Sequence, residues 1–481
     1  MFSASLSNGH YPSSPPPPTC LYTILPHLLL LLLPLPLPPF SRLPLHQTQA
    51  STSISLSTDI QVCFLFIGYS YCCCYFRSFK ILCCLSIKES TNDNQITPQE
   101  PSSPPKNNLR VVLAAGGTGG HIIPAVAIAD ELRVSNPNIE ILFIGTPNSM
   151  ESTSIPSAGY PFTSIPPVKL FRPLVSLENL SLPIHLIHSI IHSFKLLKEF
   201  DPHVVIGTGG YVSFPTCLAA LLQRTKIVIH EQNSVPGIAN YVLSYFSHLV
   251  FLSYNSTIEC FPKKHNCLVT GNPVRVSLRQ FVSRAVARLE FFPMAGEEAK
   301  VILVLGGSLE ANAINIALLN VYSQMLLEHK DWYIIWQTGV ESYNEMESLV
   351  RNHSNLVLKP FLHSMDLAYA AADLIVSRAG AMTCSEILAT GKSAILIPSP
   401  DVAEGHQFKN ASLMADVAGT RVITEDELDS TTLGTAIEEI LGDDALRAEM
   451  SERALRAAKP DASAQIAQHI LSLVESSAKR K

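Results

Sequence analysis

The sequence predicts an α/β protein built from two parallel β-sheets, each covered by helices, and three observations support this fold class. From residue 109 onward, short β-branched runs alternate with amphipathic helical stretches, which is the pattern of βα units in a parallel sheet. The two halves open alike, with an apolar strand that ends in glycines: RVVLAAGGTGGH in one and VILVLGGSLEAN in the other. A chain of 481 residues also exceeds what one hydrophobic core usually supports.

The apolar runs give the expected strands and domains. Strands are expected near residues 110–115, 139–145, 203–207 and 226–230, and again near 300–305, 332–337, 373–376 and 394–397. Residues 109–275 are assigned to a first domain and residues 276–481 to a second. Asn-Pro in GNPVR (residues 271–275) interrupts regular structure, so the segment from there to about Lys300 is the expected hinge. Because ligands bind beyond the carboxyl ends of parallel strands, we expect a ligand between the domains.

The charge distribution argues against nucleic acid as a partner. The formal net charge is -6 at pH 7, and charged residues make up 15% of the chain without long acidic or basic blocks. After residue 84 the cysteines are Cys217, Cys260, Cys267 and Cys384, and none is spaced as a zinc site requires. The sequence therefore indicates reduced cysteines and no zinc site in the folded part.

Residues 1–108 differ in composition from the rest. Before Glu89 the only acidic residue is Asp59, and Ser, Thr, Pro and Leu predominate, which is typical of an organelle transit peptide. The Pro-rich stretch PQEPSSPPKNN then indicates a disordered linker. We therefore expect a plastid (chloroplast) protein whose folded part begins at about Leu109.

Within this leader, residues 62–85 are apolar and long enough to cross a bilayer, but they include Arg77 and Lys80. Each of these charges costs about 2.5–3.5 kcal/mol near the centre of a membrane helix. Three interpretations stay open for this stretch: a continuation of the targeting segment, a membrane span, and sequence from an imperfect gene model.

The motif GGTGGH (residues 116–121) stands where the first strand meets the first helix. Its glycines let the backbone approach a ligand closely, and the N–H groups of the helix start favour anionic groups. It is neither a dinucleotide fingerprint nor a P-loop, and a tight turn without a ligand would use the same glycines. His121 follows directly, so its imidazole is expected at the cleft, either as a base that accepts a proton from a hydroxyl or as a structural hydrogen-bonding group.

Two further motifs end strands of the first half. GTGGYVSFP (residues 207–215) repeats the order strand, glycine, helix, and HEQNSVPGIAN (residues 230–240) ends a strand with a dense polar cluster. Such a cluster usually lines a site. Alternatively, Glu231, Gln232 and Asn233 hold a turn through hydrogen bonds from side chain to backbone.

The second half carries polar motifs at corresponding places. GGS (residues 306–308) offers backbone N–H groups and a hydroxyl that suit a diphosphate. RAGAMTCSE (residues 378–386) ends in Glu386, whose carboxylate either accepts two ribose hydroxyls or is solvated on a capped helix. EGHQFKNA begins a helix that places Gln407 and Asn410 on one face.

Taken together, the motifs resemble in order and spacing those of the MurG family of N-acetylglucosaminyltransferases: GGTGGH, GTGGYVSFP, HEQNSVPGIAN, GNPVR, GGS, PFLHSMDLAYAAADLIVSRAGAMTCSEI and HQFKNA. The resemblance covers nearly all of the chain from Leu109 to the C-terminus. It implies the glycosyltransferase-B architecture, in which two Rossmann-like domains with parallel sheets face each other across an interdomain cleft. The first domain would bind the acceptor and the second the UDP-sugar.

The resemblance also implies an inverting hexosyltransferase. It would move N-acetylglucosamine from UDP-N-acetylglucosamine to a polyprenyl-diphosphate-linked muramyl lipid, a step of peptidoglycan-type precursor synthesis. No metal or other cofactor is expected, since N–H groups at helix starts and Arg275 would stabilise the leaving diphosphate. No Asp-x-Asp motif occurs among the residues expected at the cleft.

Site residues follow from the matching motif positions. The resemblance implies His121 as the general base, Asn233 as a contact of the transferred sugar and Glu386 as the ribose ligand. Arg275 lies at a position near the diphosphate, and Leu362 at the position whose backbone reads uracil. The implied substrate-binding residues are Thr118, Gly119, Gly120, Asn233, Arg275, Ser308, Leu362, Ala381, Met382, Thr383, Cys384, Ser385, Glu386 and Gln407.

One position departs from the family pattern. The family usually has a glycine two residues after the serine of GGS, whereas this chain continues with Leu309 and Glu310. A carboxylate there would lie close to an anionic diphosphate, so we expect weaker donor binding unless Glu310 turns to solvent. A catalytically weak sugar-nucleotide-binding protein therefore stays open as an alternative. So does a plastid galactolipid synthase that uses UDP-galactose, although HEQN and GNPVR favour MurG.

A lipid acceptor requires contact with a membrane surface. Residues 168–174 (VKLFRPL) combine apolar side chains with Lys169 and Arg172, a pattern that suits peripheral contact with anionic lipid and also occurs in ordinary surface loops. The folded part is expected to contain no membrane-spanning segment. We thus expect a peripheral protein on a plastid membrane, facing the stroma.

Overall fold

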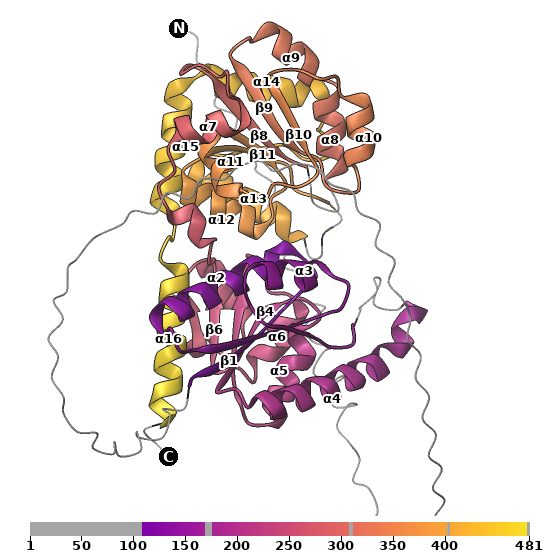
Figure 1. The fold of residues 1–481 in the computed structure, drawn as a ribbon, viewed down its shortest axis with the longest axis vertical. Coiled ribbons are helices and arrows are strands. Elements are labelled where there is room, and N and C mark those ends of the chain that lie inside the picture. Colours follow the sequence, from indigo (N-terminus) through magenta and orange to yellow (C-terminus); the bar gives the residue numbers. More distant parts are fainter. Residues whose placement is uncertain (1–107, 169–175, 307–310, 401, 403–404, 479–481) are drawn as a thin grey trace, which may run out of the picture. The chain divides into compact units, whose positions relative to one another are not determined.

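The computed structural model describes residues 108–168, 176–306, 311–400, 402 and 405–478 (Figure 1). The expectations for residues 1–107 and for residues 169–174 lie outside the described residues, as do those for Ser308, Leu309 and Glu310.

The first sheet has seven parallel strands in the order β3-β2-β1-β4-β5-β6-β7. They are β1 (Arg110–Ala115), β2 (Glu140–Gly145), β3 (Phe162–Ser164), β4 (Val204–Gly209), β5 (Lys226–Glu231), β6 (Leu249–Leu252) and β7 (Cys267–Val269). The helices of this half are α2 (Gly119–Ser135), α3 (Met150–Ser157), α4 (Leu182–Phe200), α5 (Ser213–Leu222) and α6 (Ile238–Ser244), with short 3-10 turns η1 (Leu177–Ser181), η2 (Asn255–Cys260) and η3 (Lys264–Asn266).

The second sheet has six parallel strands in the order β10-β9-β8-β11-β12-β13. They are β8 (Lys300–Leu305), β9 (Trp332–Gln337), β10 (Leu356–Lys359), β11 (Leu374–Ser377), β12 (Ser393–Leu396) and β13 (Arg421–Val422). Its helices are α8 (Asn312–Leu319), α9 (Tyr322–Glu328), α10 (Tyr343–Leu349), α11 (Met365–Ala371), α12 (Ala381–Thr390), α13 (His406–Ala418), α14 (Ser430–Gly442) and α15 (Asp444–Ala457). Between the sheets run η4 (Val276–Arg279) and α7 (Arg284–Phe291), and α16 (Ala462–Ala478) follows the second sheet.

The predicted α/β class with two parallel sheets is confirmed, and every strand expected from the sequence is present. The unexpected strands are β3, β6, β7, β10 and β13, which contain two to four residues each. Most of them are half-exposed, so they lack the continuous apolar run that marks a buried strand.

Helices cover both faces of each sheet. In β1, Val111 and Leu113 pack in the core with α2, and Val112 and Ala114 pack in the core with α4 and α5. In the second sheet, α8, α9 and α14 cover one face, and α11, α12 and α13 cover the other. Because both faces are buried, alternate residues of a strand enter different cores, and β1 and β8 are apolar almost throughout.

The two sheets share one strand order, and that order brings the glycine motifs together. β1 lies between β2 and β4, and β8 lies between β9 and β11. In each sheet, successive strands are therefore added first on one side of the first strand and then on the other. Ligands of open parallel sheets bind beyond the carboxyl ends of the strands at such a switch point. GGTGGH follows β1 and GTGG ends β4 at one switch point, and RAGAMTCSE follows β11 at the other.

The last helix returns to the first domain. α16 contributes Ile466, Ala467 and Ile470 to the core that α2 forms with the first sheet, beside which it lies in Figure 1. Lys226, at the start of β5, donates a hydrogen bond to the backbone oxygen of Leu473 in α16. The range 276–481, assigned to the second domain from sequence, thus includes one helix that packs on the first.

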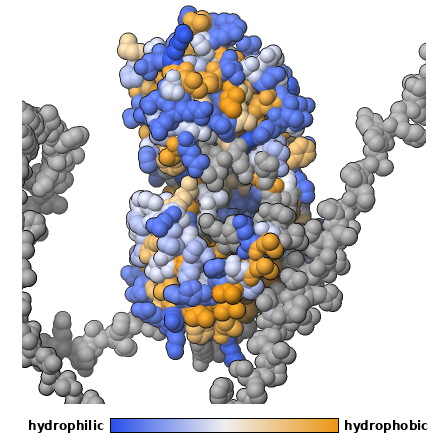
Figure 2. Space-filling view, turned by 90° about the vertical axis from the view of Figure 1, so that its right-hand side faces the viewer, coloured by the Kyte–Doolittle hydropathy of each residue, from blue (hydrophilic) through white to orange (hydrophobic). Residues whose placement is uncertain are grey.

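Helix α4 carries apolar side chains outward. Ile184, Ile187 and Ile191 recur at helical spacing and are 71%, 56% and 47% exposed, whereas the residues that α4 buries include Ser189 and Ser193. Figure 2 shows apolar residues gathered low on one face of the protein, over the first domain. A surface helix ordinarily turns its apolar stripe toward the core. α4 does so with Leu197, Ile190 and Phe194, and it exposes the isoleucines as a second apolar stripe.

The segment Leu177–Phe200, which joins η1 to α4, is long and apolar enough to cross a membrane by length and composition alone. This differs from the expectation that the folded part holds no such segment. Histidines and lysines interrupt the apolar run in the sequence, and the mean hydropathy of 1.2 reflects that mixture. A single helix of this kind is weak evidence for a span.

Asp373 joins α7 to the second sheet. Its carboxylate accepts hydrogen bonds from Arg288 of α7 at 2.5 Å and from the backbone N–H of Val301 in β8 at 2.7 Å, and Arg284 contacts the same carboxylate. The side chains of Asp373 and Arg288 are 8% and 6% exposed. A buried ion pair that loses one partner leaves an uncompensated charge, so this contact fixes α7 on the second domain.

Asp373→Ala is expected to lower the free energy of unfolding of the second domain by about 3 kcal/mol, because Arg288 would stay buried without its partner. Urea unfolding followed by tryptophan fluorescence measures this change, since Trp332 and Trp336 both lie in β9. Glu452→Ala removes an exposed ion pair on α15 and should cost less than about 0.5 kcal/mol. Equal losses in the two variants would contradict the effect of burial.

Candidate active site

The loop after β1 leads into α2 through an unusual backbone conformation. Gly117 has φ +90°, a value that residues with a side chain rarely adopt. Thr118 is the N-cap residue of α2, and Gly119 and Gly120 are its first helical residues. All three are at least partly exposed, so the N–H groups at this helix start are accessible to an anionic ligand.

The loop at the end of β4 packs closely against this first loop. A Cβ atom on Gly210 would lie 2.1 Å from the backbone oxygen of Gly116, and one on Gly209 would lie 2.5 Å from Nδ1 of His121. Both distances are too short for a carbon atom, so each position requires glycine. The motif GTGG therefore makes room for the His121 ring.

Glu151, in the first turn of α3, holds the glycine loop from the other side. Its buried carboxylate accepts hydrogen bonds from the backbone N–H of Gly117 at 3.2 Å and from the hydroxyl of Thr146 at 2.7 Å. Burial alone would raise its pKa, but these hydrogen bonds outweigh burial and the pKa is lowered. The role of Glu151 could not be predicted from the sequence, because an acidic residue at a helix start is also an ordinary helix-dipole residue.

His121 itself is half-buried at the start of α2. Its Nδ1 lies 3.1 Å from the backbone oxygen of Thr208 and 3.2 Å from Oε1 of Gln232. Burial lowers the pKa of His121, the negative charge of Glu231 opposes this shift, and His406 at the start of α13 adds to it. The imidazole is thus unprotonated at neutral pH, as a general base must be.

The HEQN turn is organised by Glu231. One carboxylate oxygen accepts hydrogen bonds from the backbone N–H and the side-chain amide of Asn233 at 3.0 and 3.2 Å, and the other accepts from Asn240 at 2.8 Å. Glu231 is 2% exposed and Asn233 is half-buried. The turn interpretation raised from the sequence therefore holds for Glu231, while Asn233 remains accessible as the predicted sugar contact.

In the second domain the predicted nucleotide residues form the start of α12. Gly380 is its N-cap residue, and the helix begins Ala381, Met382, Thr383, Cys384, Ser385, Glu386. Thr383 and Ser385 are half-buried, and the others of this run are buried. Burial raises the pKa of the Cys384 thiol to about 12, so this cysteine is not a nucleophile at neutral pH.

Glu386 is buried rather than solvated, and it has two partners. Arg275 donates a hydrogen bond to Oε1 at 2.5 Å, and the Tyr369 hydroxyl donates to Oε2 at 3.1 Å. Burial raises the pKa of Glu386, and the charge of Arg275 opposes that shift. Arg275, expected near the diphosphate, thus pairs with the expected ribose ligand, and its side chain is 32% exposed.

The remaining predicted residues lie around the same strand ends. Leu362 is buried, and its backbone N–H donates to Oε1 of Gln337 at 3.0 Å. Gln407, in the first turn of α13, accepts a hydrogen bond from the backbone N–H of Ser399 at 3.0 Å. Ser308 lies outside the described residues.

Hydrogen bonds connect the two halves of the site. The side-chain amide of Asn272 donates to the backbone oxygen of Gln232 at 3.1 Å and to the hydroxyl of Ser385 at 2.9 Å. Ser234, next to Asn233, donates to the side chain of Asn410 in α13 at 3.1 Å. The structure thus brings the HEQN turn, the α12 start and α13 together. From the sequence, Asn272 was expected only as a turn residue, and no local signal distinguishes a turn residue from one that connects the two domains.

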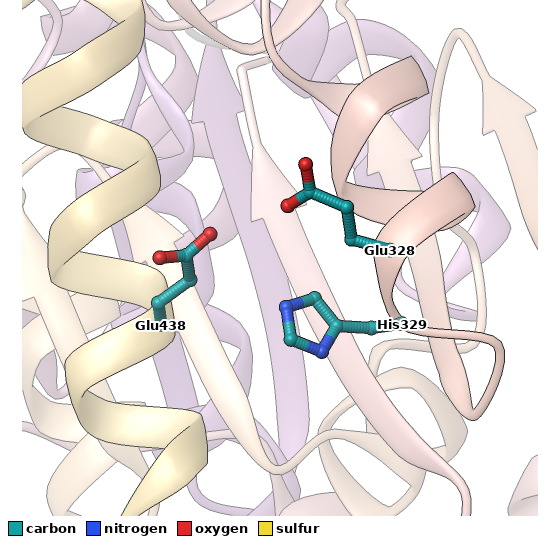
Figure 3. A group of neighbouring side chains, drawn as sticks. All are labelled: Glu328, His329 and Glu438. Carbon is teal, nitrogen blue, oxygen red and sulfur yellow. The ribbon is translucent and has the colours of Figure 1, made fainter.

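Within the described ranges, one group of side chains has the chemistry of a metal site. Figure 3 shows Glu328 and His329 at the end of α9 opposite Glu438 of α14, with ligand atoms within 4.8 Å of one another. The two glutamates are exposed, and His329 stacks on Trp332 at a ring distance of 3.8 Å. None of the predicted site residues belongs to this group, and exposed carboxylates gather often without an ion.

Models of two protein domains match the chain. The glycosyltransferase family 28 N-terminal domain matches residues 111–252, and the glycosyltransferase family 28 C-terminal domain matches residues 301–466. Each match begins within the first strand of one sheet.

Curated bacterial proteins are similar over most of the chain. A protein of Salinibacter ruber is 38% identical over 365 residues, which cover 76% of this chain and 97% of that protein. One of Bacillus cereus is 37% identical over 364 residues, covering 74% of this chain and 96% of its own length. The first is named UDP-N-acetylglucosamine--N-acetylmuramyl-(pentapeptide) pyrophosphoryl-undecaprenol N-acetylglucosamine transferase, and the second carries the same name with the number 1.

Solved structures agree with the fold. MurG of Acinetobacter baumannii superposes with a TM-score of 0.58 at 27% identity, covering 76% of this chain and 99% of that one. The UDP-GlcNAc 2-epimerase of Neisseria meningitidis bound to UDP-GlcNAc gives 0.56 at 17% identity, covering 76% of this chain and 100% of that one, which supports the glycosyltransferase-B fold alone. With both domains matched and curated relatives similar over nearly their whole length, the chain belongs to the MurG family of glycosyltransferases.

Proposed function

We propose that this chain transfers N-acetylglucosamine from UDP-N-acetylglucosamine to a polyprenyl-diphosphate-linked muramyl acceptor, with inversion at the anomeric carbon. The observation that carries the proposal is the connection of His121 to the start of α12 through Gln232 and Asn272. These hydrogen bonds hold the base on the first domain close to the helix start on the second domain that would bind the nucleotide. The curated relatives bear the name of this transferase activity.

The second domain would hold the donor. Glu386 can accept hydrogen bonds from ribose hydroxyls, and the charge of Arg275 favours its ionised form against the effect of burial. The guanidinium of Arg275 has five N–H donors, so groups not bound to Glu386 remain for the diphosphate. Together with the N–H groups at the starts of α2 and α12, it would stabilise the charge that develops on the leaving UDP, and the mechanism requires no metal.

The first domain would deprotonate the acceptor. The acceptor hydroxyl gives its proton to His121 while its oxygen attacks the anomeric carbon of the bound sugar. The bond from that carbon to the UDP oxygen breaks, and UDP leaves with the bonding electrons. Attack and departure on opposite sides of the carbon invert its configuration, and the lowered pKa of His121 returns the base to its unprotonated form.

Helix α4, with its exposed isoleucines, supports contact with a membrane surface. Its outward stripe of isoleucines continues with Lys195, which lies on the same side at helical spacing, and Lys198 follows within a turn; both lysines are exposed. Apolar side chains can enter the interface while cations bind anionic headgroups. We place the protein as a peripheral one on a plastid membrane facing the stroma; the plastid location rests on the composition of residues 1–108 alone.

Transfer of radiolabelled sugar to a polyprenyl-diphosphate muramyl acceptor tests the function directly. The purified protein should consume UDP-N-acetylglucosamine and label the lipid. Selective use of UDP-galactose would instead support the galactolipid synthase raised from the sequence. Binding of UDP-N-acetylglucosamine without transfer would support the weak binding protein.

His121→Ala is expected to lower kcat by a factor of about 10²–10⁴, the usual contribution of a positioned general base. Binding of UDP-N-acetylglucosamine, measured by calorimetry, should stay within about twofold, because the nucleotide contacts lie on α12. His353→Ala changes an exposed histidine of the second domain and serves as the control. Unchanged turnover in the His121 variant would remove its assigned role.

Ile184→Glu combined with Ile187→Glu is expected to weaken binding to vesicles of anionic phospholipid at least about tenfold, since burying each isoleucine contributes about 1.5–3 kcal/mol. Cosedimentation with the vesicles measures this. Thermal stability should not change, because both side chains are exposed in the folded protein. Val134→Glu, which alters another exposed apolar residue on α2, should bind as the unaltered protein does. Equal binding of all three proteins would exclude α4 as the membrane surface.

A further inference from the structure

A chain of side-chain hydrogen bonds runs from the candidate base to the interdomain linker. Oε1 of Gln232 lies 3.2 Å from Nδ1 of His121, and its Nε2 lies 2.9 Å from Nδ1 of His230. Nε2 of His230 lies 3.2 Å from the backbone oxygen of Gly271, the first residue of GNPVR. Gln232 and His230 are 1% and 0% exposed, so water does not compete for these contacts.

The positions of the hydrogens in this series of hydrogen bonds follow from its backbone carbonyls, because a carbonyl oxygen only accepts hydrogen bonds. The backbone oxygen of Thr208 lies 2.7 Å from Nε2 of Gln232, which identifies that atom as the amide nitrogen. The amide oxygen of Gln232 consequently faces His121. The same Thr208 oxygen lies 3.1 Å from Nδ1 of His121, so Nδ1 faces two acceptors and carries a hydrogen.

His230 completes the pattern at the other end of the chain. Its Nε2 faces the carbonyl of Gly271 and therefore carries the hydrogen. Burial lowers the pKa of His230 to about 4, so the ring is neutral at pH 7 and its Nδ1 has a lone pair. That lone pair accepts the second N–H of the Gln232 amide. Every donor in the chain thus meets an acceptor, and a reversed amide would leave two acceptors facing each other.

We propose that Gln232 is a positioning residue that holds His121 as the Nδ1–H tautomer and so leaves Nε2 free to accept the proton of the acceptor hydroxyl. The assignment rests on the proposed role of His121 as the base. Only an amide can serve here, since the position must accept from His121 and donate to Thr208 and His230. A carboxylate accepts without donating, and a thioether such as methionine offers neither a strong donor nor a strong acceptor.

The proposal is tested with the full chain and two variants of Gln232, Gln232→Met and Gln232→Glu; His121→Ala and Gln223→Met serve as reference proteins. Selective ¹⁵N labelling of histidine reads which ring nitrogen carries the hydrogen, and comparison with His121→Ala assigns the His121 signals. The unaltered protein should show Nδ1–H at His121. In Gln232→Met the Thr208 oxygen remains as an acceptor for Nδ1. The other tautomer should therefore become populated in part and kcat should fall in proportion, at least about twofold, while the affinity for UDP-N-acetylglucosamine stays within about twofold.

Gln232→Glu tests the proposal through the pH dependence of kcat/KM, which should not change if Gln232 only supports the local structure. The new carboxylate beside His121 would raise its pKa, and a base must be unprotonated, so the acid limb of kcat/KM should shift to higher pH. Gln223→Met is the matched control, because the Gln223 amide also donates to a backbone oxygen but lies at the end of α5. It should change neither the tautomer nor the pH profile.

Several outcomes would overturn the assignment. They are an Nε2–H tautomer at His121 in the unaltered protein, loss of kcat in Gln232→Met with His121 still entirely Nδ1–H, and an unmoved acid limb in Gln232→Glu. The spectroscopic result does not depend on turnover. If the unaltered protein transferred no sugar, the proposed function would be wrong. The NMR measurement would still show which nitrogen of His121 carries the hydrogen, so the two failures can be told apart.

Discussion

The close contact between the ends of β1 and β4 is the constraint on which the rest of the site depends. Gly209 and Gly210 bring one loop against the backbone of the other, and the His121 ring fills the space that a side chain on Gly209 would take. Glu151 fixes the first loop from behind, and Thr208 of β4 fixes the ring. The absence of side chains at the two glycines therefore makes room for the base, and hydrogen bonds fix its orientation.

The two domains contribute different chemistry to one place. The first supplies a neutral imidazole, and the second supplies a helix start with a buried carboxylate. Glu386 would be costly to bury alone, and Arg275, which precedes η4 in the segment between the sheets, offsets its charge. The segment that connects the domains thus also belongs to the nucleotide site. A ligand that engages Glu386 must share it with Arg275, so donor binding and the conformation of this segment are linked.

Much of the fold could be predicted from the sequence, because buried parallel strands such as β1 and β8 are continuous apolar runs that end in glycines. The short edge strands β3, β7, β10 and β13 carry no such signal. The motifs also located most candidate site residues. Their partners could not be predicted, since contacts such as His121 with Gln232 or Arg275 with Glu386 join residues more than a hundred positions apart. The outward apolar face of α4 was missed because periodicity does not say which face is buried.

The return of α16 to the first domain means that the chain passes between the domains twice. The two passages are adjacent: a Cβ atom on Gly271 would lie 2.8 Å from Cβ of Lys459, and Arg279 donates to the backbone oxygen of Pro460 at 3.5 Å. The two domains are thus joined by two chain connections that lie side by side. Two adjacent connections are expected to restrict rotation of one domain relative to the other more than a single linker would.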